Sequence, residues 1–235
     1  MTDFWTQDPR AYAELDRESR KFWLHPWLRG AIQQISPKRI LDFGCGDGSL
    51  FHQFPLQLSE LVLYDHSQPM IDMAKAHFGD SPKVSFHVSD ADIPAEHFDL
   101  VVLSLVLMTI PTKAEQRRVA GRVFQFTERG GHCLLAITHP CFRQHRFSTF
   151  KTEYSEKPFY YFNEGAPFRV QISDAGREEF VEFTDYHWSL AFTINLLLES
   201  GFLLRRVVEL PDKAALKEME SAQFPSYLVL QYQKP

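Results

Sequence analysis

The chain has 235 residues, of which 44% are hydrophobic and 23% charged, a balance that allows a full apolar core and argues against wholesale disorder. The formal net charge is −5, so no overall basic field exists to hold a polyanion, and we expect no nucleic-acid partner. The length fits one large α/β domain or a domain with a small cap.

Cysteine usage and the lack of long apolar runs bear on where the protein resides. The three cysteines, Cys45, Cys133 and Cys141, are odd in number, which favours reduced thiols over a disulfide framework. Residues 1–5 lack the features of a signal peptide, and no apolar run approaches the roughly 18 residues of a membrane span. We therefore expect a soluble cytoplasmic protein without a membrane partner. Because no Cys-x-x-Cys or His-Glu-x-x-His sequence occurs, we expect no metal ion.

Residues 1–35 precede the first predicted strand. Their apolar side chains, such as Tyr12, Trp23 and Trp27, recur at mixed three- and four-residue steps, which predicts one or two helices. Apolar stripes of this kind usually pack against a core. The simplest interpretation is that these helices cover the sheet of the domain that follows.

The glycine-rich run after the first predicted strand is the most informative part of the sequence. An apolar strand that contains Asp42 leads into three glycines at alternate positions, Gly44, Gly46 and Gly48. Glycine has no Cβ, so it adopts positive φ and lets a ligand lie against bare backbone. A strand that ends this way is typical of nucleotide-type ligand sites. The spacing differs from the Gly-x-Gly-x-x-Gly of dinucleotide sites, and a purely structural turn is the alternative.

A second predicted strand ends in a carboxylate. After a helix-length stretch over residues 49–59, the run Glu60–Asp65 is apolar and closes on Asp65, which lies 23 positions after Asp42. This is near the distance of roughly 20 residues at which α/β nucleotide folds place a ribose-binding acid. The following residues predict a helix with Ser67 as its N-cap.

The third, fourth and fifth predicted strands complete a parallel sheet. Val84–Val88 alternates, Phe98–Ser104 is an almost unbroken apolar run typical of a central parallel strand, and His132–Thr138 follows a predicted helix over Lys113–Thr127. Ligands of open α/β sheets bind outside the carboxyl ends of the strands. We therefore expect the residues that follow these strands to line one crevice.

The segment from Phe142 to Trp188 is rich in aromatic residues. It has 13 of them in 47 positions, about twice the average of the chain. Val170–Ile172 and Phe180–Phe183 alternate like the strands of a hairpin. The rings either pack this insertion onto the body of the protein or line an apolar substrate pocket, and both roles can hold for different rings.

The C-terminal part predicts one helix and two strands. The helix over Thr193–Phe202 has Gly201 at a position suited to a left-handed C-terminal cap. Leu203–Leu210 and Tyr227–Tyr232 read as the sixth and seventh strands.

Taken in order, these segments resemble the class I methyltransferases that use S-adenosylmethionine (SAM). Asp42-x-Gly44-x-Gly46-x-Gly48 resembles their motif I, and the resemblance extends from about Ile40 to Gln233, weakest across 143–185. It implies an α/β, Rossmann-like sheet of seven mostly parallel strands with helices on both faces, an antiparallel last strand and an aromatic-rich cap between strands five and six. The division it implies is N-terminal helices over the cofactor site in 1–35, a SAM-binding core in 36–141, a substrate cap in 142–186 and the rest of the core in 187–235.

The resemblance also implies the cofactor and its contacts. SAM is the expected cofactor and S-adenosylhomocysteine (SAH) the product. Asp65 would bind the ribose hydroxyls, Asp90 the adenine amino group, and the backbone amide of Ala91 would face the ring, while Tyr12 would contact the cofactor from the N-terminal helices. The full expected cofactor site is Tyr12, Asp42, Gly44, Cys45, Gly46, Gly48, Asp65, His66, Met70, Asp90, Ala91, Asp92, Ser104 and Leu105.

The expected activity is methyl transfer to an oxygen or nitrogen of a small aromatic or apolar metabolite. His139 and His187 are candidate general bases, although either could simply form a hydrogen bond. The residues expected to contact the acceptor are Leu107, Phe142, Tyr161, Tyr186 and Trp188. The alternatives are an RNA or protein methyltransferase, a non-catalytic SAM-binding protein and an NAD-dependent oxidoreductase. Ser104–Met108 stands where nucleic-acid amine methyltransferases carry an Asn-Pro-Pro-Tyr or Asp-Pro-Pro-Tyr sequence.

Overall fold

The computed structural model describes residues 20–55, 57–145, 147, 150–154, 158–172, 180–211 and 224–235. Its main element is a seven-stranded sheet of order β3-β2-β1-β4-β5-β10-β9. The strands are β1 (Arg39–Phe43), β2 (Glu60–Tyr64), β3 (Val84–His87), β4 (Phe98–Ser104), β5 (Thr127–Thr138), β9 (Leu203–Pro211) and β10 (Pro225–Gln233). The first five are parallel, and β10 lies antiparallel between β5 and β9. The predicted Rossmann-like fold with an antiparallel last strand is confirmed.

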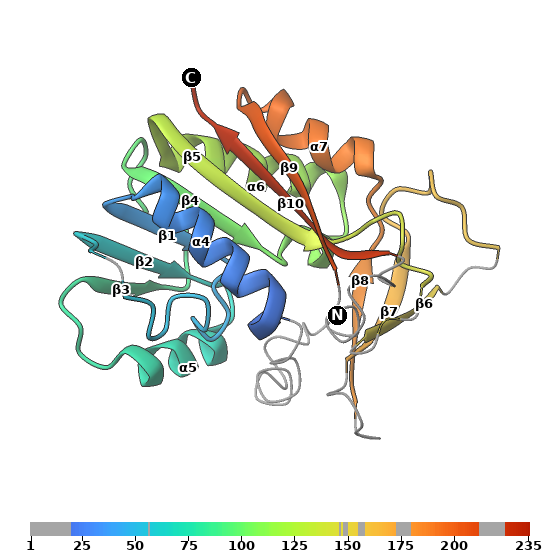
Figure 1. Ribbon diagram of the computed structural model, residues 1–235, viewed down its shortest axis with the longest axis horizontal. Coiled ribbons are helices and arrows are strands. Elements are labelled where there is room, and N and C mark those ends of the chain that lie inside the picture. Colours follow the sequence, from blue (N-terminus) through green and yellow to red (C-terminus); the bar gives the residue numbers. More distant parts are fainter. Residues whose placement is uncertain are drawn as a thin grey trace.

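Helices cover both faces of this sheet (Figure 1). On one face α4 (His25–Ile35) and α5 (Gln68–Phe78) pack over strand residues such as Ile40, Leu63 and Val102. On the other face α6 (Lys113–Phe126) and α7 (Leu190–Glu199) pack over residues such as Leu41 and Val101. Successive side chains of a strand point to opposite faces, so each parallel strand needs apolar residues at adjacent positions. This accounts for the nearly unbroken apolar runs in the sequence.

Two predicted helix ends are confirmed by their backbone geometry. The Ser67 side chain accepts a hydrogen bond from the Met70 amide and caps the N-terminus of α5. Beyond α7, Gly201 has φ of +105°, and its amide donates to the carbonyl of Leu198. Both caps satisfy backbone groups that a helix end leaves free.

The prediction of a helix over residues 49–59 is wrong. The chain forms successive turns after Gly48 and no helix in the described part of that stretch. The Arg29 guanidinium reaches from α4 and donates three hydrogen bonds, to the carbonyls of Ser49, Leu50 and His52 at 2.8–3.2 Å. Arg29, about 20 positions away, therefore binds carbonyls that would accept hydrogen bonds within a helix. Sequence periodicity cannot detect a contact of this kind.

The insertion after β5 forms a separate sheet. It comprises β6 (Phe150–Tyr154), β7 (Pro167–Ile172) and β8 (Val181–Tyr186), paired antiparallel in that order. Figure 1 shows this cap sheet beside the carboxyl end of β5. The predicted hairpin corresponds to β7 and β8, and β6 is a third strand that the sequence analysis did not predict.

Of the predicted N-terminal helices, the structure describes the π-helical turn η1 (Arg20–Leu24) and α4. Tyr12 lies outside the described residues. Within the described ranges, no helix is both long and apolar enough to cross a membrane.

Candidate active site

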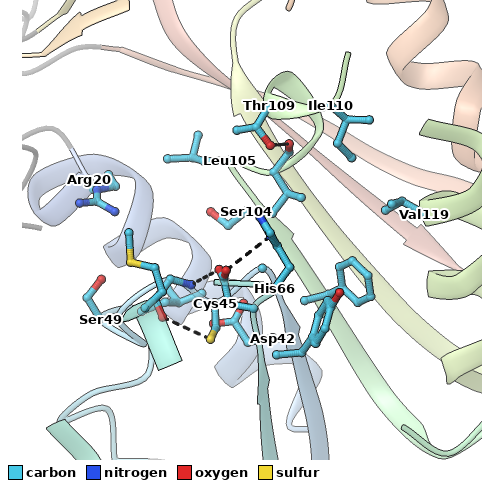
Figure 2. A pocket seen from close by; sticks show the side chains of 18 of the residues that line it. Arg20, Asp42, Cys45, Ser49, His66, Ser104, Leu105, Thr109, Ile110 and Val119 are labelled. Carbon is cyan, nitrogen blue, oxygen red and sulfur yellow. Dashed lines mark hydrogen bonds and ion pairs between the residues drawn. The ribbon is translucent and has the colours of Figure 1, made fainter. Parts of the chain in front are cut away.

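A cavity of about 390 Å³ lies at the carboxyl ends of β1, β2 and β4. Figure 2 shows side chains from separate stretches of the chain around it, including Arg20, Asp42 and Thr109. The lining residues are Arg20, His25, Asp42, Phe43, Gly44, Cys45, Gly46, Ser49, Leu50, Tyr64, Asp65, His66, Met70, Ser104, Leu105, Val106, Thr109, Ile110, Glu115, Arg118 and Val119. The strands thus bring their ends to one hollow, as the rule for open α/β sheets requires.

The three motif glycines serve different purposes. All have positive φ, at +81° for Gly44, +55° for Gly46 and +74° for Gly48. A Cβ on Gly44 would lie 2.3 Å from the side chain of Val106, and one on Gly48 would lie 2.8 Å from the ring of Phe78. A Cβ on Gly46 would meet nothing within 4 Å. Gly44 and Gly48 are therefore required by packing, whereas Gly46 leaves backbone bare to the cavity.

Asp65 fastens the end of β2 to the glycine loop. Its Oδ2 accepts a hydrogen bond from the Gly46 amide at 2.9 Å, and its Oδ1 accepts one from the Ser67 amide at 2.9 Å. The amides of Gly44 and Cys45 donate to the carbonyl of Tyr64. These bonds hold the Asp65 carboxylate at the edge of the cavity, where its Oδ1 also lies 3.6 Å from Nδ1 of His66.

Asp42 is a buried acid in the floor of the cavity, with 2% of its surface exposed. Burial raises its pKa to about 8, and the negative charges of Asp65 and Asp47 act in the same direction. No hydrogen-bond donor contacts its carboxyl group among the residues that the structure describes. A buried carboxyl group facing a cavity is suited to a cationic ligand, which would favour its ionised form.

The structure places nine of the predicted cofactor residues around the cavity. They are Asp42, Gly44, Cys45, Gly46, Asp65, His66, Met70, Ser104 and Leu105. Gly48, Asp90, Ala91 and Asp92 are not among its lining residues. The Asp90 carboxylate lies 3.0 Å from Nε of Arg122 and 3.5 Å from Nη1 of Arg118. The contact of Asp90 with adenine stays a prediction. The two arginines already pair with the Asp90 carboxylate.

One wall of the cavity, formed after β4, was not predicted from the sequence. Val106, Thr109 and Ile110 follow the two predicted residues Ser104 and Leu105, and the strand-end rule could have indicated them. Glu115, Arg118 and Val119 of α6 carry no sequence signal, because they reach the cavity only through the packing of that helix.

The two candidate bases lie outside the cavity lining and differ in their bonding. Both ring nitrogens of His139 are engaged, since Nδ1 accepts from the Cys141 amide and Nε2 donates to Glu209 at 2.7 Å. His187 is fully buried and donates from Nε2 to the carbonyl of Tyr161 at 2.7 Å, while its Nδ1 has no partner among the described residues. Burial lowers the pKa of both histidines.

The predicted acceptor residues are not among the lining residues of the large cavity. Leu107 and Trp188 line a small separate void of about 10 Å³. The Tyr161 hydroxyl accepts a hydrogen bond from the Leu190 amide at 2.7 Å and so helps to cap α7. Phe142 packs against the ring of His139, with centroids 4.8 Å apart. Tyr186 is half-buried at the end of β8.

The fold and this cavity define a Rossmann-like protein with a nucleotide-type ligand site. Residues 41–135, from β1 into β5, match the family model described as "Methyltransferase domain". This part of the chain is therefore similar to a methyltransferase domain.

Two curated relatives share part of the chain. "Malonyl-[acyl-carrier protein] O-methyltransferase 1" of Ilyobacter polytropus is 31% identical over 46% of this chain and 40% of the relative. "Ubiquinone biosynthesis O-methyltransferase" of Aromatoleum aromaticum is 26% identical over 51% of this chain and 52% of the relative. The chain thus spans about half the length of the curated relatives it matches.

Solved structures extend the likeness of the fold to nearly the whole chain. N-methyltransferase NodS from Bradyrhizobium japonicum in complex with SAH has a TM-score of 0.64 at 15% identity, covering 99% of this chain and 100% of that one. A SAM-dependent methyltransferase from Mesorhizobium loti has a TM-score of 0.63 at 22% identity, covering 89% and 96%. At sequence identities of 15% and 22%, these similarities show a shared fold alone.

Proposed function

We propose that the protein transfers a methyl group from SAM to an oxygen or nitrogen atom of a small molecule. The observation that carries this proposal is the cavity at the strand ends, where the bare backbone of Gly46 and the carboxyl groups of Asp42 and Asp65 face one space. The methyltransferase domain match covers the same strands and loops.

The residues of the cavity fit the chemical parts of SAM. Asp65 would accept hydrogen bonds from the ribose hydroxyls, which are charge-assisted and therefore strong. Asp42 would face the positive charge of the ligand, and Gly46 would let it lie close to the loop. When bound, SAM supplies an already electrophilic methyl group. The task left to this chain is to orient the acceptor and exclude water, which can lower a barrier by roughly 7–11 kcal/mol.

Several observations favour a small acceptor. The net charge of −5 does not suit a nucleic acid, and the cap sheet is built around an apolar cluster that includes Tyr154, Phe168 and Phe183. The names of the relatives describe an O-methyltransferase of malonyl-[acyl-carrier protein] and one of ubiquinone biosynthesis, and the solved neighbours include an N-methyltransferase. The aromatic cap would then form the acceptor side of the site.

Of the two histidines, His187 is the better candidate for a general base. A base must have a free lone pair within reach of the proton that it removes. Nδ1 of His187 has no partner among the described residues, whereas both ring nitrogens of His139 are engaged. We assign His139 to holding the turn after β5.

Incubation with methyl-labelled SAM tests the proposed function. The purified protein is offered a small-metabolite extract, total RNA and a protein lysate in separate reactions, and Gly46→Val is the control that lacks room for the cofactor. The proposal predicts label in the small-molecule fraction for the wild type alone. Label in RNA or protein would contradict the acceptor class, and NADH binding without SAM binding would contradict the methyltransferase assignment.

A further inference from the structure

Four buried side chains between the cap sheet and the body carry polar atoms without partners. These atoms are Nε and Nη1 of Arg143, the hydroxyl of Tyr154, Oδ1 of Asp185 and Nδ1 of His187, each unpaired within the described part of the chain. Leaving a buried polar atom unpaired is costly, and such atoms are uncommon in folded proteins. Their concentration in one place therefore calls for a chemical explanation.

The register of the cap sheet brings these side chains together. Tyr154 pairs with Phe168, and Phe168 pairs with Asp185, so the three share one face. His187 follows Asp185 by two residues, and its ring centroid lies 6.3 Å from that of Tyr154. The guanidinium of Arg143 lies 4.7 Å from the centroid of the Phe168 ring. We call these four polar residues, Arg143, Tyr154, Asp185 and His187, the Arg143 cluster.

The cluster holds a cation that lacks an anion. Arg143 is 3% exposed, and the one hydrogen bond that its guanidinium donates to a described residue is a long one of 3.5 Å from Nη2 to the carbonyl of Thr138. No carboxylate of the described residues lies within 4 Å of its guanidinium. The nearby Asp185 compensates only in part, because burial raises the pKa of its carboxyl group to about 7 against the opposing effect of the Arg143 charge, so near neutral pH the group is only partly ionised. An unpaired buried charge is strongly destabilising, so an anion from outside the chain would be well stabilised here.

The cluster is separated from the large cavity by a single segment. Arg143 shares the void of about 10 Å³ with Leu107 and Met108, and the next residues, Thr109 and Ile110, line the large cavity. The Trp188 indole donates to the carbonyl of Ile110 at 3.1 Å and ties the cap to this segment. A small molecule that reached past residues 107–110 could therefore contact both places.

We propose that the Arg143 cluster binds a carboxylate group of the methyl acceptor, with Arg143 as the recognising cation and Tyr154 as a second donor. The inference rests on the proposed function and adds a substrate class to it. The void has room for about one water molecule, so the cap sheet and the Arg143 side chain must shift apart when the carboxylate enters. Specificity follows because a neutral analogue would leave the guanidinium unpaired.

Calorimetry with matched probes tests this proposal. Benzoate and benzamide, which have similar shape and differ in charge, are titrated into the protein saturated with SAH. We expect benzoate to bind more tightly than benzamide. Arg143→Met should lower the affinity for benzoate by roughly tenfold or more, which is the usual effect of losing hydrogen bonds to a charged group. Arg169→Met is the control, because Arg169 is an exposed cap residue paired with Glu153 and Glu182. It should leave benzoate binding unchanged.

A second variant keeps the test decisive if Arg143→Met does not fold. Asp185→Asn removes a competing negative charge with little change of shape, so it should tighten benzoate binding. SAH binding, measured in the same samples, reports on the proposed function separately. If SAH binds while wild-type protein binds benzoate no better than benzamide, the cluster holds only water and the proposal is overturned. Unchanged or weaker benzoate binding by Asp185→Asn would also overturn it.

Discussion

The Asp65 carboxylate accepts a hydrogen bond from the Gly46 amide at 2.9 Å, which joins the end of β2 to the glycine loop after β1. The contact spans 19 residues and fixes both the acid and the bare backbone on one side of the large cavity. The glycine loop and the acid at the end of β2, which together indicate a cofactor site in the sequence, are thus joined by a hydrogen bond. Substitutions at Asp65 or Gly46 should affect cofactor affinity more than they affect folding.

Asp65→Ala should weaken SAM binding by roughly 1.5–3 kcal/mol, the usual contribution of hydrogen bonds to a charged group. The variant loses the proposed ribose acceptor and also releases the Gly46 amide. Isothermal titration calorimetry of the two proteins measures the difference.

Asp99→Ala is the matched control for that experiment. Its carboxylate also accepts two backbone hydrogen bonds, from Lys38 and Arg39, but at the opposite end of β1. It should lower the free energy of unfolding without a specific loss of SAM affinity. If Asp65→Ala binds SAM as the wild type does, the assignment of Asp65 to the ribose is wrong.

Gly46→Val and Gly44→Ala should separate binding from folding. Gly46→Val places its side chain in open space, so it should fold, at a cost of about 1–2 kcal/mol for the positive φ, and should lose SAM binding. Gly44→Ala puts a Cβ 2.3 Å from Val106, so it should lose about 1–3 kcal/mol of stability through overpacking. Urea denaturation and calorimetry distinguish the two effects. Normal SAM binding by folded Gly46→Val would contradict the site.

The stability of the ligand-free protein should fall as pH rises from 6.5 to 8. Folding raises the pKa of Asp42 from its usual 3.8 to about 8, so in this range the folded state holds a proton that the unfolded state has released. The contribution is at most about 1.4 kcal/mol per pH unit. Below 6.5, histidines whose pKa is lowered by burial, such as the half-buried His25 with a pKa of about 3, act in the opposite direction.

The Asp42→Asn variant isolates the contribution of Asp42 to this pH dependence, because an asparagine side chain cannot ionise. Urea denaturation at several pH values should show a smaller decrease of stability for Asp42→Asn than for the wild type between pH 6.5 and 8. Parallel pH profiles for the two proteins would mean that Asp42 is already ionised in the folded state. The acid would then not be the buried neutral group that we describe.

The two histidines should differ in their effects. His187→Ala should reduce turnover while SAM affinity stays within about 0.5 kcal/mol of wild type, and the wild-type rate should fall at pH values below the pKa of His187, which burial holds below 6.5. His139→Ala should chiefly lower the free energy of unfolding, since it frees Glu209 and the Cys141 amide. Equal turnover in wild type and His187→Ala would exclude His187 as the base.

Local sequence signals predicted most of the fold because each depends on nearby residues. The apolar run Phe98–Ser104 marks a strand buried on both faces, Ser67 caps a helix through its own next turn, and Gly201 ends one. The glycines and Asp65 of the cofactor site follow strand ends, where the fold rule places ligands.

The remaining features arise from contacts between distant residues. Arg29 donates hydrogen bonds to carbonyls of the turns after Gly48, which lie 20 to 23 positions ahead. Arg118 reaches the cavity from α6 and also contacts Asp90, which no spacing rule foresees. The burial of Arg143 depends on the cap sheet, whose strand β6 was not predicted from the sequence. These features required the three-dimensional structure.

Titration of SAH into the purified protein at neutral pH shows whether the cavity is a cofactor site. We expect one SAH to bind each chain, Asp65→Ala to weaken this binding by roughly tenfold or more, and folded Gly46→Val to abolish it. If wild-type protein that is folded by circular dichroism binds neither SAH nor SAM, the protein is not a SAM-dependent methyltransferase.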